Sequence, residues 1–148
     1  MVDIDLCFTP AVELVRRIRN KELSPVDVVS NSLARIDAVN ETLNCFCFTF
    51  HEEALEKAKL AERAVMRGEP LGALHGIPIA IKDFTPTQGK ITTMGSKVYA
   101  DWLPDEDAQI VKDLTGAGAI MVFVTGGVSA IASLGIVYWS GASVDAIL

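Results

Sequence analysis

A lysine at the end of an apolar run is the residue whose type and position best suit chemistry. Lys82 follows the run Ile77–Ile81 and precedes Asp83. Ligands of open α/β sheets bind at the carboxyl ends of strands. An amine carried into an apolar layer loses hydration, which lowers its pKa and favours the neutral form. A neutral amine can act as a general base or form a Schiff base. Spacing alone leaves open a second interpretation, in which Lys82 points to solvent or pairs with Asp83.

Helices that alternate with strands are predicted to position this lysine. Ser24 is a typical N-cap followed by a first-turn proline, and Gly68 is a typical residue after a helix end. We predict helices over 10–21, from 24 onwards, over 51–67 and from Pro104 to Gly116, strands over 44–50, 76–81 and 119–124, and a loop over 85–99. This order indicates an α/β fold in which N-terminal helices precede alternating strands and helices around a largely parallel or mixed sheet.

The composition is that of a folded domain with an acidic balance. The 148 residues are about one domain's worth. Hydrophobic residues make up 50% and charged residues 22%, which excludes a disordered or low-complexity chain. The formal net charge of −6 argues against nucleic acid as the main partner, because phosphate contacts need clustered cations.

The cysteines and the N-terminus indicate a reducing compartment. Cys7, Cys45 and Cys47 do not make a disulfide framework, and Cys45 and Cys47 would share one face of a strand as buried thiols. No Cys or His lies at zinc-ligand spacing, so we expect no metal site. Residues 1–5 are acidic and lack the apolar core of a signal peptide. We therefore expect a cytoplasmic protein.

The C-terminal third is almost free of charge. After Asp113 the only charged residue is Asp145, so an uncharged run covers 114–144. A run of that length could span a bilayer, but glycines interrupt it and basic flanking residues do not follow it. The alternative, which we prefer, is a buried parallel strand over 119–124 followed by a buried helix over 128–138. We expect no membrane-spanning segment.

Four segments in the right order resemble parts of one known family. Leu71–Asp83 resembles the family's strand-and-lysine segment, and Glu22–Val29 resembles its N-terminal helix. Thr92–Ser96 is similar to the loop after the lysine, and Asp107–Ile120 is similar to the next helix and strand. The family is the amidase signature family, and the resemblance covers roughly 10–122. We therefore expect a single incomplete amidase-like domain over 1–148, in which 1–122 matches the family and 123–148 diverges.

The resemblance implies hydrolysis of a carboxylic amide through an acyl-serine intermediate. The family uses a Ser–cis-Ser–Lys triad, in which an unprotonated lysine draws a proton through a bridging serine and activates a nucleophilic serine, while backbone N–H groups stabilise the oxyanion. Lys82 matches the family lysine and is the one catalytic position that carries over. His75 lies in the turn before the strand and is expected to be structural. The resemblance implies a small amide substrate and no metal or organic cofactor.

The C-terminal part departs from the family pattern. Phe123–Gly126 stands where the family has a Gly-Lys-Thr-Asn-type turn, and Gly127–Ser133 looks like the helix after the loop that carries the cis-serine. Ser140–Asp145 does not match the motif of the nucleophile. The serines of this region cannot be assigned to either triad position: Ser129, Ser133, Ser140 and Ser143. We therefore expect the chain to be inactive alone, because a catalytic lysine without its serines has no nucleophile to activate.

Two other functions stay open at this point. One is a small hydrolase with a rearranged site that pairs Lys82 with Ser129 or Ser96. The other is a non-catalytic binding or membrane-associated protein that uses the apolar C-terminal segment.

A shortened sheet also leaves an unpaired edge, so we expect self-association through that edge.

Overall fold

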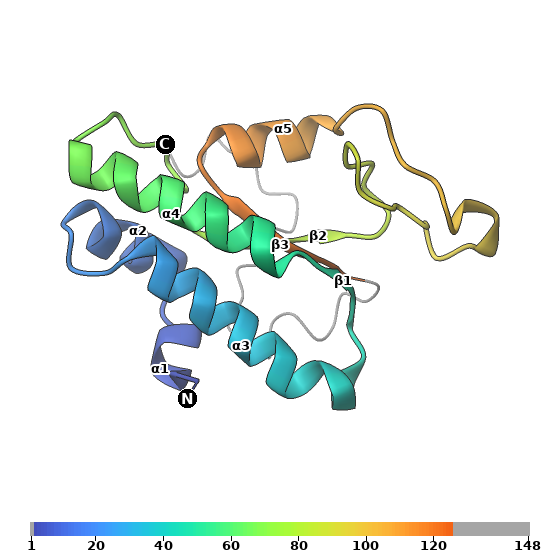
Figure 1. The fold of residues 1–148 in the computed structure, drawn as a ribbon, viewed down its shortest axis with the longest axis horizontal. Helices are drawn as coiled ribbons and strands as arrows, with labels where there is room; N and C mark the ends of the chain where they lie inside the picture. The colour runs from blue at the N-terminus through green and yellow to red at the C-terminus, as the bar shows by residue number, and fades with distance from the viewer. Residues whose placement is uncertain (1, 126–148) are drawn as a thin grey trace.

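The computed structural model describes residues 2–125 of the chain. They form helices and strands in the order shown in Figure 1: α1 (Ile4–Cys7), α2 (Ala11–Arg19), α3 (Pro25–Leu43), β1 (Phe46–Thr49), α4 (His51–Arg67), β2 (Pro78–Lys82), the 3-10 helix η1 (Lys97–Tyr99), α5 (Gln109–Gly116) and β3 (Ile120–Thr125).

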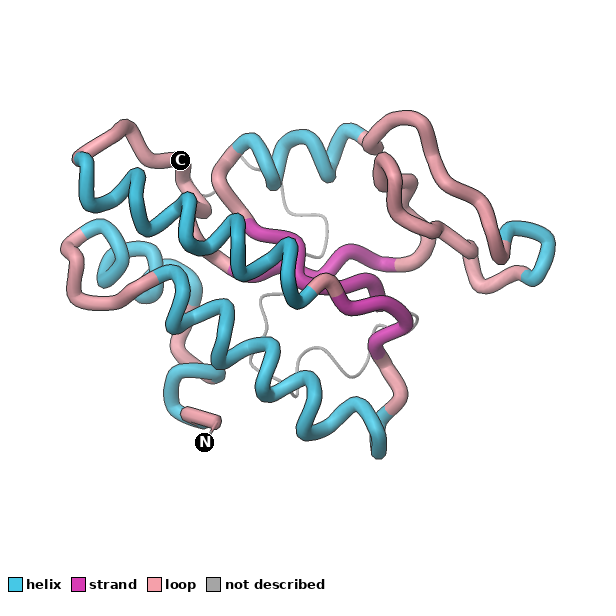
Figure 2. The backbone as a smooth tube through the Cα atoms, viewed as in Figure 1, coloured by secondary structure: helices cyan, strands magenta, loops and turns pink. Residues whose placement is uncertain are grey.

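A small mixed sheet lies between two layers of helices. Its strand order is β1-β3-β2, with β1 antiparallel and β2 parallel to the central strand β3. Helices α3 and α4 cover one face of the sheet and α5 covers the other (Figure 2). The predicted α/β class, with N-terminal helices before alternating strands and helices, is confirmed.

The central strand lies at the centre of the core, because every residue of β3 is buried. The Phe123 ring is fully buried and meets the Phe46 ring edge-on at 4.2 Å between centroids. Small alanines on α4 let it lie close to α3 and the sheet, in a cluster made by Val29, Leu33, Ile36, Cys45, Phe46, Ala54, Ala58, Ala61, Ile120, Val122 and Phe123. Burying a Phe side chain of this kind contributes about 1.5–3 kcal/mol.

The helix ends follow the predicted signals. Ser24 caps α3, since its Oγ accepts a hydrogen bond from the N–H of Val26 at 2.9 Å. Gly68 ends α4 with a φ of +69°, a left-handed conformation that glycine adopts without strain. The N-terminal helix α1, which the sequence did not predict, is capped by the Asp3 side chain.

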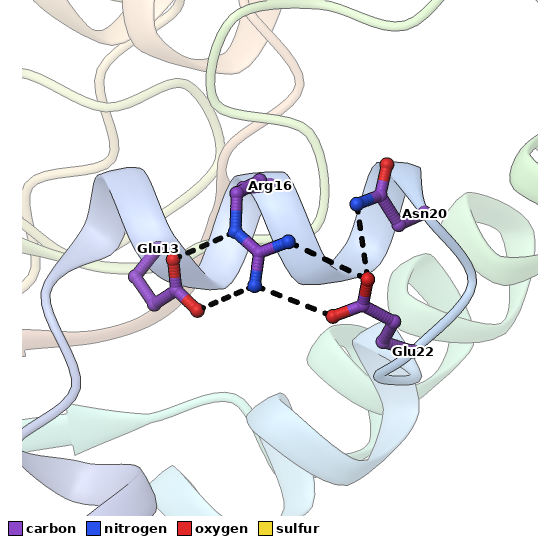
Figure 3. Close-up of polar contacts among 4 residues, drawn as sticks. All are labelled: Glu13, Arg16, Asn20 and Glu22. Carbon is purple, nitrogen blue, oxygen red and sulfur yellow. Dashed lines mark hydrogen bonds and ion pairs between the residues drawn. The ribbon is translucent and has the colours of Figure 1, made fainter.

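The arginine-rich helix α2 uses its charges in two ways. Arg16 lies between the carboxylates of Glu13 and Glu22, with Asn20 also bonded to Glu22 (Figure 3). These ion pairs raise the pKa of Arg16 and lower the pKa of Glu13, both on the exposed surface. Arg19 instead donates a hydrogen bond of 3.1 Å to the Gly72 carbonyl. Arg16 and Arg19 therefore both bond to groups within this chain.

The predicted start of α5 at Pro104 is wrong, because the helix begins at Gln109. The acidic residues before it hold the preceding loop instead of a first helical turn. The Asp107 carboxylate accepts from the N–H of Gln88 at 2.7 Å, and the Asp105 carbonyl accepts from the Gln88 side chain at 3.0 Å.

The expectation that Cys45 and Cys47 are both buried on one strand face is also wrong. Cys45 is buried, but Cys47 is exposed and the strand begins only at Phe46. The Asn40 side chain accepts from the N–H groups of Cys45 and Phe46, and the β1–β3 register shifts between Phe46 and Phe48. Both features break the simple alternation on which the prediction rested.

The uncharged run begins within the last turn of α5, and its residues Ile120–Thr125 form β3 inside the sheet. Within residues 2–125, no helix is long and apolar enough to cross a membrane. The predicted helix over 128–138 lies outside the described residues.

Candidate functional site

Lys82 lies where the two parallel strands end together. It is the last residue of β2 and pairs in register with Thr125, the last residue of β3. The next residue, Asp83, donates its N–H to the Thr125 carbonyl at 2.8 Å. The Lys82 carbonyl accepts from the N–H groups of Phe84 and Thr85, which turns the chain away from the sheet. The carboxyl end of a parallel pair is the usual ligand-binding edge of an α/β sheet.

The side chain of Lys82 is exposed, and among residues 2–125 its amine has no hydrogen-bond or ion-pair partner. The expectation that the strand carries this amine into an apolar layer is therefore not met. The second interpretation agrees with the structure in its first form, in which Lys82 points to solvent, and not in its second, since Lys82 makes no ion pair with Asp83. The amine is available to a group that approaches the strand end.

Asp83 is buried and turned toward the following loop. Its Oδ1 accepts from the N–H of Thr93 at 2.6 Å, and its Oδ2 accepts from the Thr93 hydroxyl. The sequence suggested Asp83 only as a partner for Lys82. No local pattern signals this role, because its partner Thr93 lies ten residues later in the loop.

The loop between β2 and α5 is fastened a second time through Lys90. Its amine bonds to Glu53 at the start of α4 and lies 4.2 Å from the centroid of the Phe50 ring. Hydrogen bonds from Lys57 and then Lys90 lower the pKa of Glu53. Figure 1 shows that the rest of this loop extends away from the sheet.

The turn before β2, which leads to Lys82, packs closely against the backbone of residues 117 and 118, just before β3. A Cβ on Gly72 would lie 2.2 Å from the Ala117 carbonyl oxygen, and a Cβ on Gly118 would lie 2.9 Å from the Cα of His75. The N–H of Gly76 donates to the Gly118 carbonyl at 3.0 Å. The Nε2 atom of His75 lies 3.0 Å from the Ala61 carbonyl of α4, so this ring joins the turn to the helix.

No described serine is hydrogen-bonded to Lys82. Ser96, a partner that the small-hydrolase alternative requires, accepts from the N–H of Val98 as the cap of η1. Ser24 bonds to Glu62 at 2.5 Å and lines a pocket of about 180 Å³ whose lining does not include Lys82. Ser129, the other partner considered for Lys82, lies outside the described residues, as do the three further serines that the sequence left unassigned: Ser133, Ser140 and Ser143.

Metal binding finds no support in the described part of the chain. Residues 2–125 contain no group of three or more His, Cys, Asp or Glu side chains that could hold a metal ion.

The amidase family model matches residues 27–131, which include the turn, both parallel strands and Lys82. The chain therefore belongs to the amidase family. The resemblance that the motifs carry is confirmed.

Relatives of known function and solved structures agree with this assignment. A glutamyl-tRNA(Gln) amidotransferase from Salinispora tropica has one subunit that is 41% identical over 118 residues, 80% of this chain and 24% of that protein. A fatty acid amide hydrolase superposes with a TM-score of 0.78 at 26% identity, over 86% of this chain and 22% of its own. The peptide amidase from Stenotrophomonas maltophilia superposes with a TM-score of 0.73 at 30% identity, over 79% of this chain and 24% of its own. This chain thus spans about a quarter of each relative's length.

Proposed function

We propose that this chain carries the lysine-bearing part of a site that hydrolyses carboxylic amides, with Lys82 as the proton acceptor. The observation that carries the proposal is the position of Lys82 in the family match, at the joint carboxyl end of β2 and β3, with an amine that no described residue engages. In the family chemistry, the lysine draws a proton through a bridging serine, and a second serine attacks the amide carbonyl to form an acyl-serine.

We further propose that the chain alone does not form this acyl-enzyme. Two facts support this part. No described serine bonds to Lys82, and the sequences at 127–133 and 140–145 do not match the family's serine motifs. The substrate class is a small molecule with a carboxylic amide, as the names of a peptide amidase and a fatty acid amide hydrolase among the relatives suggest.

A fluorophosphonate probe tests the second part on the full chain. We expect intact mass spectrometry of the folded protein to show no adduct. A stoichiometric adduct on one serine, lost in Lys82→Met, would instead support the small hydrolase with a rearranged Lys–Ser site. Lys112→Met, which changes an exposed lysine on α5, is the matched control.

A chimera tests the role of Lys82 itself. Residues 2–125 replace the matching part of the Stenotrophomonas maltophilia peptide amidase, and ammonia release from a peptide amide is measured. Lys82→Met should lower the rate by about 10³-fold or more, because the proton acceptor is lost. Lys112→Met should leave the rate unchanged. A chimera that stays active without Lys82, or one that folds but is inactive with it, contradicts the proposal.

For partners, we propose self-association at the outer edge of β2. Both outer strands of the sheet are edges within residues 2–125, but the Asn40 side chain already bonds to the N–H and C=O of Phe46 on β1. Unpaired strand edges favour pairing with another chain. Sedimentation velocity should show concentration-dependent association, and a single monomeric species at every concentration contradicts it.

For the compartment, we propose the cytoplasm. The support is chemical: Cys7 and Cys45 are buried thiols outside any disulfide. Burial raises the pKa of both thiols, which keeps them protonated and unreactive. Localisation of a tagged chain by fractionation tests this proposal, and recovery with a secreted or membrane fraction contradicts it.

A further inference from the structure

The carboxylate of Asp83 is buried without a cation beside it. Its side chain belongs to a residue that is 7% exposed, and no ion pair of Asp83 occurs within residues 2–125. Burying a carboxylate is unfavourable unless its oxygens are hydrogen-bonded. Here both oxygens accept from one residue, Thr93, through its N–H at 2.6 Å and its hydroxyl.

Asp83 also ties the strand end that carries the proposed proton acceptor. Its N–H donates to the Thr125 carbonyl on β3, so its backbone is bonded to the sheet while its side chain is bonded to the loop. Lys82, one residue earlier, is exposed and makes no ion pair with Asp83. Asp83 therefore lies between the lysine and the loop without neutralising the lysine.

Thr93 passes this contact on to a strained turn. Its hydroxyl donates to Asp83 and accepts from the N–H of Gly95 at 3.1 Å, while its carbonyl accepts from the N–H of Ser96 at 2.9 Å. Met94 has a φ of +52° and Gly95 one of +69°. The left-handed region is unfavourable for a side chain such as that of Met94, so surrounding contacts must hold the turn in this shape.

We propose that Asp83 and Thr93 form a clamp that positions Lys82 relative to the turn 93–96, so that both are positioning residues for the candidate site. The clamp rests on the proposed function, because it acts through the proposed proton acceptor. It differs from the Lys90–Glu53 contact, which fastens the same loop to α4 and does not reach the strand end.

The clamp is tested on the full chain with Thr93→Val, which keeps the shape of the side chain and removes the hydroxyl, and with Thr93→Ser, which restores it. Asp83→Asn changes the other partner by removing one acceptor. Trace acetylation across a range of pH measures the reactivity of Lys82 relative to Lys112 in the same sample. Amide hydrogen exchange reports on the turn.

In Thr93→Val and Asp83→Asn, Lys82 acetylation relative to Lys112 should change at least about threefold, because the position of the amine is no longer fixed, and exchange of the amides in 93–96 should rise at least about tenfold. Exchange in β3 and α4 should not change, and Thr93→Ser should behave as the parent chain. The clamp is refuted if Lys82 keeps its relative reactivity when the turn opens, or if Ser does not restore it. These readouts need no turnover, so a failure of amide hydrolysis and a failure of the clamp are separate results.

Discussion

Two lysines eight positions apart meet opposite surroundings. Lys90 has a side chain that is 19% exposed, a bond to Glu53 and the Phe50 ring beneath it. Lys82 is exposed, and no residue within 2–125 engages its amine. Both lysines lie next to an isoleucine in the sequence, so neither the residue type nor this apolar neighbour separates them.

The difference teaches how to distinguish a structural lysine from a candidate for chemistry. A lysine whose charge is satisfied by a carboxylate and an aromatic face stabilises the fold. A lysine at the shared end of two parallel strands, with its backbone fixed and its amine unengaged, is free to act on a ligand. The family match supports that assignment for Lys82.

The largest expected effect on stability comes from disturbing the turn before β2, which precedes Lys82 in the sequence. In Gly72→Ala the new Cβ would lie 2.2 Å from the Ala117 carbonyl oxygen, so the turn must move away from the start of β3. We expect a loss of about 2–4 kcal/mol in the free energy of unfolding, measured by urea denaturation. Gly116→Ala is the control, because nothing lies within 4 Å of its added Cβ. Equal stability of the two variants would show that the close contact does not hold the sheet.

A direct comparison of the lysines should give a smaller effect. Lys90→Met removes the bond to Glu53 and the contact of the charge with Phe50, and we expect the free energy of unfolding to fall by about 1 kcal/mol. Lys82→Met should change it by less than about 0.5 kcal/mol, as for an exposed residue without partners. Urea midpoints of the two variants decide the matter. If Lys82→Met costs more, the contrast between the two lysines is reversed.

The smallest expected effect is a change in the pH dependence of stability. Hydrogen bonds from Lys57 and Lys90 lower the pKa of Glu53 from its ordinary value of 4.5. A carboxylate with a lowered pKa in the folded state contributes stability above its unfolded pKa, and that contribution is lost as the pH falls through the folded pKa. Below about pH 4.5 the parent chain should therefore lose stability more steeply than Lys90→Met. Parallel pH profiles of the urea midpoint would exclude Lys90 as a cause.

Local patterns predicted most of the secondary structure and the lysine itself. The alanine stripe of α4, the Ser24-Pro25 start of α3 and the apolar runs of β2 and β3 are signals within a few residues, so their elements appear where expected. The start of α5 failed for a physical reason. Asp107 resembles a first-turn acid in sequence, but its carboxylate is used by Gln88, nineteen residues earlier.

The sequence by itself determined the α/β class, the family and the place of Lys82 at a strand end, because periodicity, caps and motif order are properties of short segments. Only the tertiary structure decided what each side chain meets. In the folded chain Asp83 bonds to Thr93, and Lys82 stays exposed. Lys90 pairs with Glu53, which lies 37 positions earlier in the sequence. Partners so distant in the chain are chosen by packing and register, which depend on the whole fold and not on the residues beside them.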